Sequence, residues 1–132
     1  MDTDDKEKEV GQLLEGELTE KILGSAFKVL NTLGSGFLEK IYENALVLEL
    51  RRLEIEVEQQ KPLKVHYEGV VVGEYLADLI VGGRVIVECK AVSHLDPAHE
   101  AQLLNYLKAT NLRVGLLFNF GRPKLQYRRF VL

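Results

Sequence analysis

Two carboxylates and a lysine lie at the ends of one short apolar stretch of the sequence. The segment DLIVGGRVIVECK, residues 78–90, is mostly Val, Ile, Leu and Gly, yet it begins with Asp78 and ends with Glu88 and Lys90. Strands this apolar are usually covered on both faces of a sheet, where a charged group without a partner is destabilising. We therefore expect something in the structure to compensate these charges.

Glu88 and Lys90 are neighbours on one face of the expected strand. Successive side chains of a strand point to opposite faces, so residues two apart share a face, and Cys89 between them points to the other. An ion pair between Glu88 and Lys90 at a sheet edge is one interpretation of this spacing. Cys89 is expected to be a small buried apolar residue rather than a nucleophile.

Whether Asp78 joins this face depends on the turn between the two strands. A two-residue turn at 82–83 would place Asp78 opposite Val87, where it could be a solvated carboxylate. A three-residue loop at 82–84 would instead place it opposite Glu88, on the same face. In that second register two carboxylates converge, with a lysine alongside, and such oxygen ligands suit Mg²⁺ or Mn²⁺.

The rest of the chain predicts the elements that must position this hairpin. Two helices are expected at about residues 18–30 and 38–53, separated by the glycines of NTLGSG. Strand periodicity begins at Ile55 and runs through IEVEQQ, PLKVHYEG, VVVGEYLADLIV and RVIVECKAV. DPAHEAQLLNYLKATN predicts a third helix with Asp96 as N-cap and Pro97 at its first position, and the strands LRVGLLFNF and KLQYRRFVL follow.

Composition limits the class of protein. With 132 residues, 46% of them hydrophobic, the chain fits one domain, expected at 18–132 after a flexible acidic lead-in at 1–17. The single cysteine excludes an internal disulfide and a thiolate zinc site, and the apolar runs are too short to span a membrane, so a cytoplasmic location is expected. Residues 61–132 hold 10 basic and 6 acidic residues, which indicates either an ordinary solvated edge or a locally positive surface.

Several motifs together resemble a known family. An Asp, nine residues and then Glu-x-Lys resembles the signature of the PD-(D/E)XK nuclease superfamily. GFLEKIY contains Gly36, Glu39 and Tyr42 as G-x-x-E-x-x-Y, which resembles the GxxExxY family, a branch of that superfamily. QLLNY supplies Gln102 and Tyr106 as the Q-x-x-x-Y that follows the Glu-x-Lys strand in RecB-like nucleases, and GLLFNFG followed by KLQYRRFVL is also similar to this family.

The resemblance implies a fold and a chemistry. The fold would be a restriction-endonuclease-like α/β core, a central mixed β-sheet flanked by helices in the order α-α-β-β-β-α-β-β. The activity would be hydrolysis of phosphodiester bonds with Mg²⁺ (or Mn²⁺) held by Asp78, Glu88 and the backbone carbonyl of Cys89, with Glu39 approaching from the second helix. Lys90 would orient or help deprotonate the attacking water.

The remaining motif residues would have supporting roles. Gln102 and Tyr106 share one helical face and would steady Lys90 or touch the phosphate backbone, unless they are only a polar fringe of the helix. Tyr42 would brace Glu39, and Glu39 could equally be a favourable acid in a first helical turn. The other polar residues of the second helix, including Glu43, are interpreted as ordinary.

The resemblance also implies partners. The expected partner is DNA or RNA, and no membrane, and the small size of the chain is compatible with a homodimer or a protein partner. The alternative function is a non-catalytic module that binds nucleic acid or a protein partner on a nuclease-like fold. Ala77 replaces the nominal proline before the aspartate, at a loosely specified position.

Overall fold

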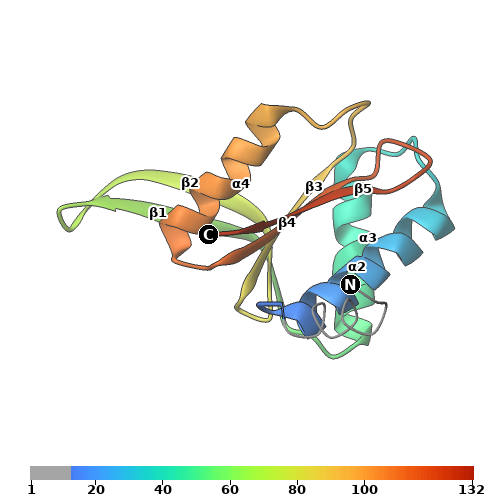
Figure 1. Ribbon diagram of the computed structural model, residues 1–132, viewed down its shortest axis with the longest axis horizontal. Helices are drawn as coiled ribbons and strands as arrows, with labels where there is room; N and C mark the ends of the chain where they lie inside the picture. The colour runs from blue at the N-terminus through green and yellow to red at the C-terminus, as the bar shows by residue number, and fades with distance from the viewer. Residues whose placement is uncertain (1–12) are drawn as a thin grey trace, which may run out of the picture.

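The computed structural model describes residues 13–132 and arranges them in three layers, helices on either side of one sheet (Figure 1). The helices are α2 (Gly16–Leu33), α3 (Glu39–Arg52) and α4 (Pro97–Thr110). The strands are β1 (Val57–Tyr67), β2 (Val70–Val81), β3 (Val85–Lys90), β4 (Val114–Asn119) and β5 (Gln126–Val131). The expected α/β class and element order are therefore confirmed.

The helices differ from the predicted ones mainly at their ends. α2 extends from Gly16 to Leu33 rather than over 18–30, and it ends where Gly34 adopts a φ of 73° and donates its N–H to the Leu30 carbonyl. Only glycine takes this left-handed conformation freely, so the first glycine of NTLGSG sets the end of the helix. The predicted flexible lead-in at 1–17 overlaps the start of α2, and residues 1–12 lie outside the described part of the chain.

The third helix begins as predicted. The Asp96 side chain accepts a hydrogen bond from the Ala98 N–H at 2.7 Å, and Pro97 occupies the first helical turn. His99 completes this cap, because its ring Nδ1 accepts the Asp96 N–H at 3.1 Å. Asp96 and His99 together fix the position at which α4 starts over the sheet.

One mixed sheet joins the five strands in the order β1-β2-β3-β4-β5. Only β3 and β4 are parallel, and α4 forms the crossover between them. IEVEQQ and PLKVHYEG, which the sequence suggests as two segments, form the single long strand β1. Pro62 is tolerated inside β1 because β1 is an edge strand. On its open side, no neighbouring strand needs the N–H that proline lacks.

Two apolar clusters cover the two faces of this sheet. Odd-numbered residues of β3 pack with α2 and α3, whereas Ile86 of the same strand packs with α4. The β2–β3 hairpin is thus buried on both faces, as its composition predicts. No helix in residues 13–132 is long and apolar enough to cross a membrane.

The chain leaves β3 through a tightly packed crossing. The Asn119 side chain accepts the Val92 N–H and donates to the Val92 carbonyl, at 3.0 and 2.9 Å. The Phe120 N–H donates to the Lys90 carbonyl at 2.8 Å. Gly121 lies against this crossing so closely that a Cβ there would be 2.3 Å from the Val92 oxygen.

We predict that Gly121→Ala destabilises the fold by about 1–3 kcal/mol, because the atoms it would meet are backbone and cannot rotate away. Gly24→Ala is the matched control, since Gly24 is an exposed position of α2 with no atom within 4 Å of an added Cβ. It should instead add about 0.5–1 kcal/mol through helix propensity. Chemical denaturation of both variants makes the comparison, and equal stability of Gly121→Ala and wild type would contradict the packing argument.

Candidate active site

The structure adopts the register that brings Asp78 and Glu88 together. β2 and β3 pair as Leu79 with Val87 and as Val81 with Val85, so the connecting loop is residues 82–84. The two glycines of the loop have φ values of 60° and 68°, a conformation that glycine adopts without strain. The same register extended by one pair places Asp78 opposite Glu88.

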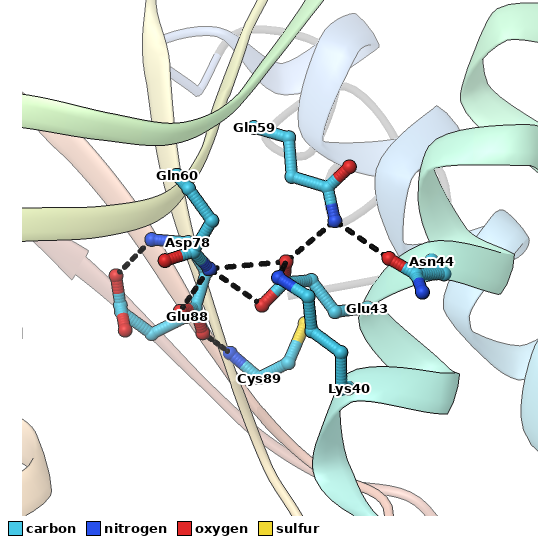
Figure 2. Close-up of polar contacts among 8 residues, drawn as sticks. All are labelled: Lys40, Glu43, Asn44, Gln59, Gln60, Asp78, Glu88 and Cys89. Atoms are coloured by element: carbon cyan, nitrogen blue, oxygen red, sulfur yellow. Dashed lines mark hydrogen bonds and ion pairs between the residues drawn. The ribbon is translucent and has the colours of Figure 1, made fainter.

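Asp78 and Glu88 lie at a fork where backbone pairing between β2 and β3 ends. Beyond it β2 continues beside β1, and β3 continues beside β4 to Lys90. Two side chains replace the missing ladder bonds (Figure 2): the Asp78 N–H donates to Glu88 Oε1 and the Cys89 N–H donates to Asp78 Oδ2, each at 2.9 Å. Both carboxylates are therefore fixed by backbone groups of the opposite strand.

The two strands of the β1–β2 hairpin also change faces at this point. In β1, Val57 packs with α2 and α3 whereas Leu63 packs with α4, although an even spacing should keep them on one face. In β2 the same change occurs between Leu79 and Ala77. Gln60 lies midway in β1 with a φ of 54°, which turns the strand over. The fork is thus reached by side chains from both helical layers.

From the side of α3, the fork meets a buried carboxylate, Glu43, which is only 2% exposed. Its oxygens accept hydrogen bonds from Lys40 Nζ and Gln59 Nε2, both at 2.6 Å, and from Gln60 Nε2 at 3.0 and 3.1 Å. Burial raises the pKa of Glu43, but the hydrogen bonds from Gln59, Lys40 and Gln60 outweigh it, so the pKa is lowered. Glu43 is therefore held in its charged form.

The Gln60 amide connects Glu43 to the fork. Its Nε2 donates to Glu43 and also to Asp78 Oδ1, at 3.3 Å, so one amide group lies between two carboxylates (Figure 2). An amide donor bridging two acids reduces their repulsion without adding charge. The left-handed φ of Gln60 brings the side chain to this position.

At the fork itself, burial raises the pKa of both carboxyl groups. Glu88 is 2% exposed, and burial, followed by the neighbouring charge of Asp78, raises its pKa to about 9. Burial also raises the pKa of Asp78, against the hydrogen bond from the Cys89 N–H. At neutral pH the pair therefore holds a proton, since two close carboxylates in a dry site cannot both ionise.

Glu39 lies near the fork, as predicted, in the first turn of α3. Burial raises its pKa, the nearby Lys90 lowers it, and the charges of Asp78 and Glu43 raise it. The side chain is thus within the electrostatic field of the site. Glu39 and Glu43 are four residues apart, so α3 presents both to the same side.

Lys90 does not form the ion pair with Glu88 that the sequence left open. Its Nζ donates to Gln102 Oε1 at 3.1 Å, and within residues 13–132 no lysine or arginine is within 4 Å of the Glu88 or Asp78 carboxylate. Gln102 of α4 thus holds the ammonium at the edge of the fork, the contact predicted from the Q-x-x-x-Y motif.

Tyr106, one turn after Gln102, is buried near the same carboxylates. Burial, then the charges of Glu88 and Asp78, raise its pKa to about 12, so the hydroxyl stays protonated. Its ring lies 5.2 Å from that of Tyr75 of β2.

The prediction that Tyr42 braces Glu39 is wrong, because Tyr42 makes its contacts with other residues. Tyr42 points to the core, where its ring stacks on Phe120 at 4.9 Å. Its hydroxyl donates to the Gly34 carbonyl at 2.6 Å and accepts the Phe37 N–H at 3.1 Å. Both contacts of the hydroxyl are with the loop before α3, so Tyr42 supports this loop rather than Glu39 itself.

Cys89 confirms its predicted structural role. Its side chain is fully buried with the core facing α2 and α3, and burial raises the pKa of the thiol. The thiol therefore stays protonated and is no nucleophile.

The donor groups at the fork fit a hard divalent cation. Besides the bond that Glu88 Oε1 accepts from the Asp78 N–H, the two carboxyl groups share a side-chain hydrogen bond, and Asp78 Oδ1 also accepts the long bond from Gln60. No three Asp, Glu, His or Cys side chains of residues 13–132 are gathered as a metal cluster. Mg²⁺ usually takes only one or two carboxylates and completes its shell with water and substrate oxygens, so Asp78 and Glu88 suffice.

The sequence did not reveal Glu43, Gln59 and Gln60 as site residues. Glu43 was interpreted as part of an ordinary polar helix face, and the two glutamines as the end of a strand. One signal was present in the sequence. Glu39 and Glu43 are about one helical turn apart, so if Glu39 faces the site, Glu43 should face it too.

Comparison with known proteins gives a family match. A family model described as PD-(D/E)XK nuclease superfamily matches residues 16–130, from the first residue of α2 into β5. Searches of curated proteins and of solved structures gave no match.

We predict that Glu88→Gln stabilises the protein at alkaline pH in the absence of metal. The folded state binds the Glu88 proton more tightly than the unfolded state, so wild-type stability falls as pH rises from about 4.5 towards the folded pKa of about 9. Glutamine keeps the oxygen that accepts the Asp78 N–H and does not titrate. The variant should match wild type near pH 4 and exceed it by on the order of 1–3 kcal/mol at pH 8.

Denaturation curves in EDTA across this pH range provide the measurement. Glu74→Gln, at an exposed position on β2, is the control and should not change the pH dependence of stability. A Glu88→Gln variant that is less stable than wild type at pH 8 would show that Glu88 is charged in the fold.

Proposed function

The chain belongs to the PD-(D/E)XK nuclease superfamily, and on that premise we propose that it is a metal-dependent nuclease that hydrolyses phosphodiester bonds of DNA or RNA. One observation carries the proposal. Asp78 and Glu88 meet at the fork with no cationic side chain in ion-pair contact in the described chain, and Lys90 follows on the same strand. A structural ion pair would instead use Lys90 to neutralise Glu88.

We further propose that the chain is a GxxExxY member of this superfamily. Gly36, Glu39 and Tyr42 match that pattern, and their positions around the start of α3 support the proposal. Gly36, with a φ of 115°, lies in the loop that Tyr42 closes through hydrogen bonds, and Glu39 begins the helix beside the fork. The motif therefore sets where α3 presents its acids.

The proposed metal ligands are Asp78, Glu88 and the backbone carbonyl of Cys89, with Glu39 as a further acid nearby. A bound Mg²⁺ or Mn²⁺ would polarise the phosphate and lower the pKa of a bound water. In the fork, a backbone N–H of the opposite strand holds one oxygen of each carboxylate. Burial, followed by the charge of Asp78, raises the pKa of Glu88, and a bound cation would favour the charged form of both acids.

Lys90 is proposed to orient the attacking water and to oppose the charge that develops on the phosphate. Gln102 accepts a hydrogen bond from the ammonium through its amide oxygen, so the direction of the lysine side chain is fixed. Lys90 is half-buried, which leaves a path from solvent for the water and the substrate.

We predict that Lys90→Met lowers metal-dependent cleavage by roughly 100-fold or more, the effect typical of losing one preorganised donor to a transition state. Metal affinity should change little, because Lys90 is not one of the proposed metal ligands. Asp78→Asn and Glu88→Gln should lose both metal affinity and cleavage. Lys28→Met removes a charge from α2, where Lys28 pairs with Glu49, and should leave metal affinity and cleavage unchanged.

Calorimetric titration with Mg²⁺ and Mn²⁺, beside cleavage assays on single- and double-stranded DNA and RNA, separates the outcomes. Cleavage that persists in EDTA or in Glu88→Gln would refute the proposal. Metal binding lost in Glu88→Gln without cleavage of any substrate would favour the non-catalytic binding module.

A further inference from the structure

A groove of about 420 Å³ lies between the β1–β2 hairpin and α4. Beyond the fork this hairpin leaves the other strands and projects as an arm (Figure 1). α4 packs on β1, so one wall of the groove is a strand of the arm and the other is the second half of the helix. Its polar lining comes from Lys64, His66, Asn105, Lys108 and Asn111.

The groove adjoins the proposed catalytic site. Tyr75 lines it and contacts Tyr106, whose pKa is raised in part by the charges of Glu88 and Asp78. On α4, Gln102, Asn105 and Tyr106 follow one stripe of the helix surface at spacings of three and four. A ligand lying along this stripe would pass from Lys90 into the groove within about 9 Å, the rise of six helical residues.

The charges of the groove suit a polyanion. Its lining holds two lysines and a histidine and no carboxylate. Neither Lys64 nor Lys108 forms an ion pair within residues 13–132. The chain as a whole has a net charge of −3, and the proposed catalytic fork is acidic. The lining of the groove holds no acid, so the groove is locally positive.

We infer that this groove binds a single strand of the nucleic-acid substrate next to the bond that is cleaved. The inference rests on the proposed nuclease function and adds the substrate class to it. Lys64 and Lys108 contact phosphates, and Tyr75 stacks on an unpaired base. Basic grooves with an aromatic platform are the usual means of holding a single strand, because every base offers a π face.

An unpaired strand fits better than a duplex for two reasons. The groove has the volume of a small-ligand site and lies between a strand and a helix. Tyr75 is 39% exposed and can receive a base face, whereas the faces of bases in a duplex are covered by stacking.

Fluorescence anisotropy tests the inference with the full chain in EDTA, so that binding is measured without cleavage. The probes are a labelled oligothymidine of about 12 nucleotides and a duplex of the same length. Wild type should bind the single strand more tightly. The double variant Lys64→Gln, Lys108→Gln should lose affinity on the order of tenfold, and the slope of log affinity against log salt should fall by about 1.4.

Matched variants test whether binding depends on this groove or only on the total positive charge of the protein. Lys21→Gln, Lys28→Gln removes the same charge from α2 and should bind as wild type does. Tyr75→Leu should lose about tenfold in affinity and Tyr75→Phe should retain it, because stacking needs only the ring. Unfolding curves check that each variant is folded.

The contrary results are specific. Equal affinity of groove variants and wild type, or preference for the duplex, would overturn the inference while leaving the nuclease proposal intact. Competition by a poly-glutamate peptide as strong as by oligothymidine, with no effect of Tyr75→Leu, would assign the groove to acidic polypeptides. Binding through the groove without metal-dependent cleavage would instead refute the nuclease proposal alone.

Discussion

β2 and β3 can pair only as far as Leu79 and Val87, because beyond them each strand follows a different neighbour. Where they part, the backbone N–H groups of Asp78 and Cys89 need acceptors, since buried donors without partners are destabilising. The carboxylates of Glu88 and Asp78 are those acceptors. The position of the acids, the approach of α3 and the placement of Lys90 all depend on this separation of strands.

Using carboxylates as backbone acceptors gathers negative charge where water is scarce. The protein answers with neutral donors and a shared proton: Gln60 bridges Glu43 and Asp78, and Glu88 has a strongly raised pKa. Among residues 13–132, the only cationic side chain bonded to this network is Lys40, at its outer end on Glu43. Electrostatic strain of this kind is common where a fold is arranged for a function rather than for stability alone.

The sequence predicted much of this because the relevant information is local. Hydrophobic period, the NTLGSG break and the Asp96–Pro97 start define the helices, and the family pattern selects Asp78, Glu88, Lys90 and Gln102. It left the hairpin register open, since two glycines permit either turn. It missed Glu43 and Gln60 because their roles arise from contacts between α3 and β1 and from one left-handed residue, and neither is encoded in a short pattern. Tyr42 was assigned to the wrong partner because its hydroxyl bonds to Gly34 and Phe37 of the preceding loop, and helical spacing does not show where that loop lies.

The β1–β2 arm and the fork are governed by different turns. The loop at 82–84 sets the register of Asp78 against Glu88, whereas the turn at Glu68 and Gly69 joins the far end of the arm. Adding one residue to each strand at that far turn would lengthen the arm by about 3.3 Å without altering the fork. The length of the arm can therefore change without any change in the fork. We expect the arm to be the place where chains that share this fork differ, and where length is most readily engineered.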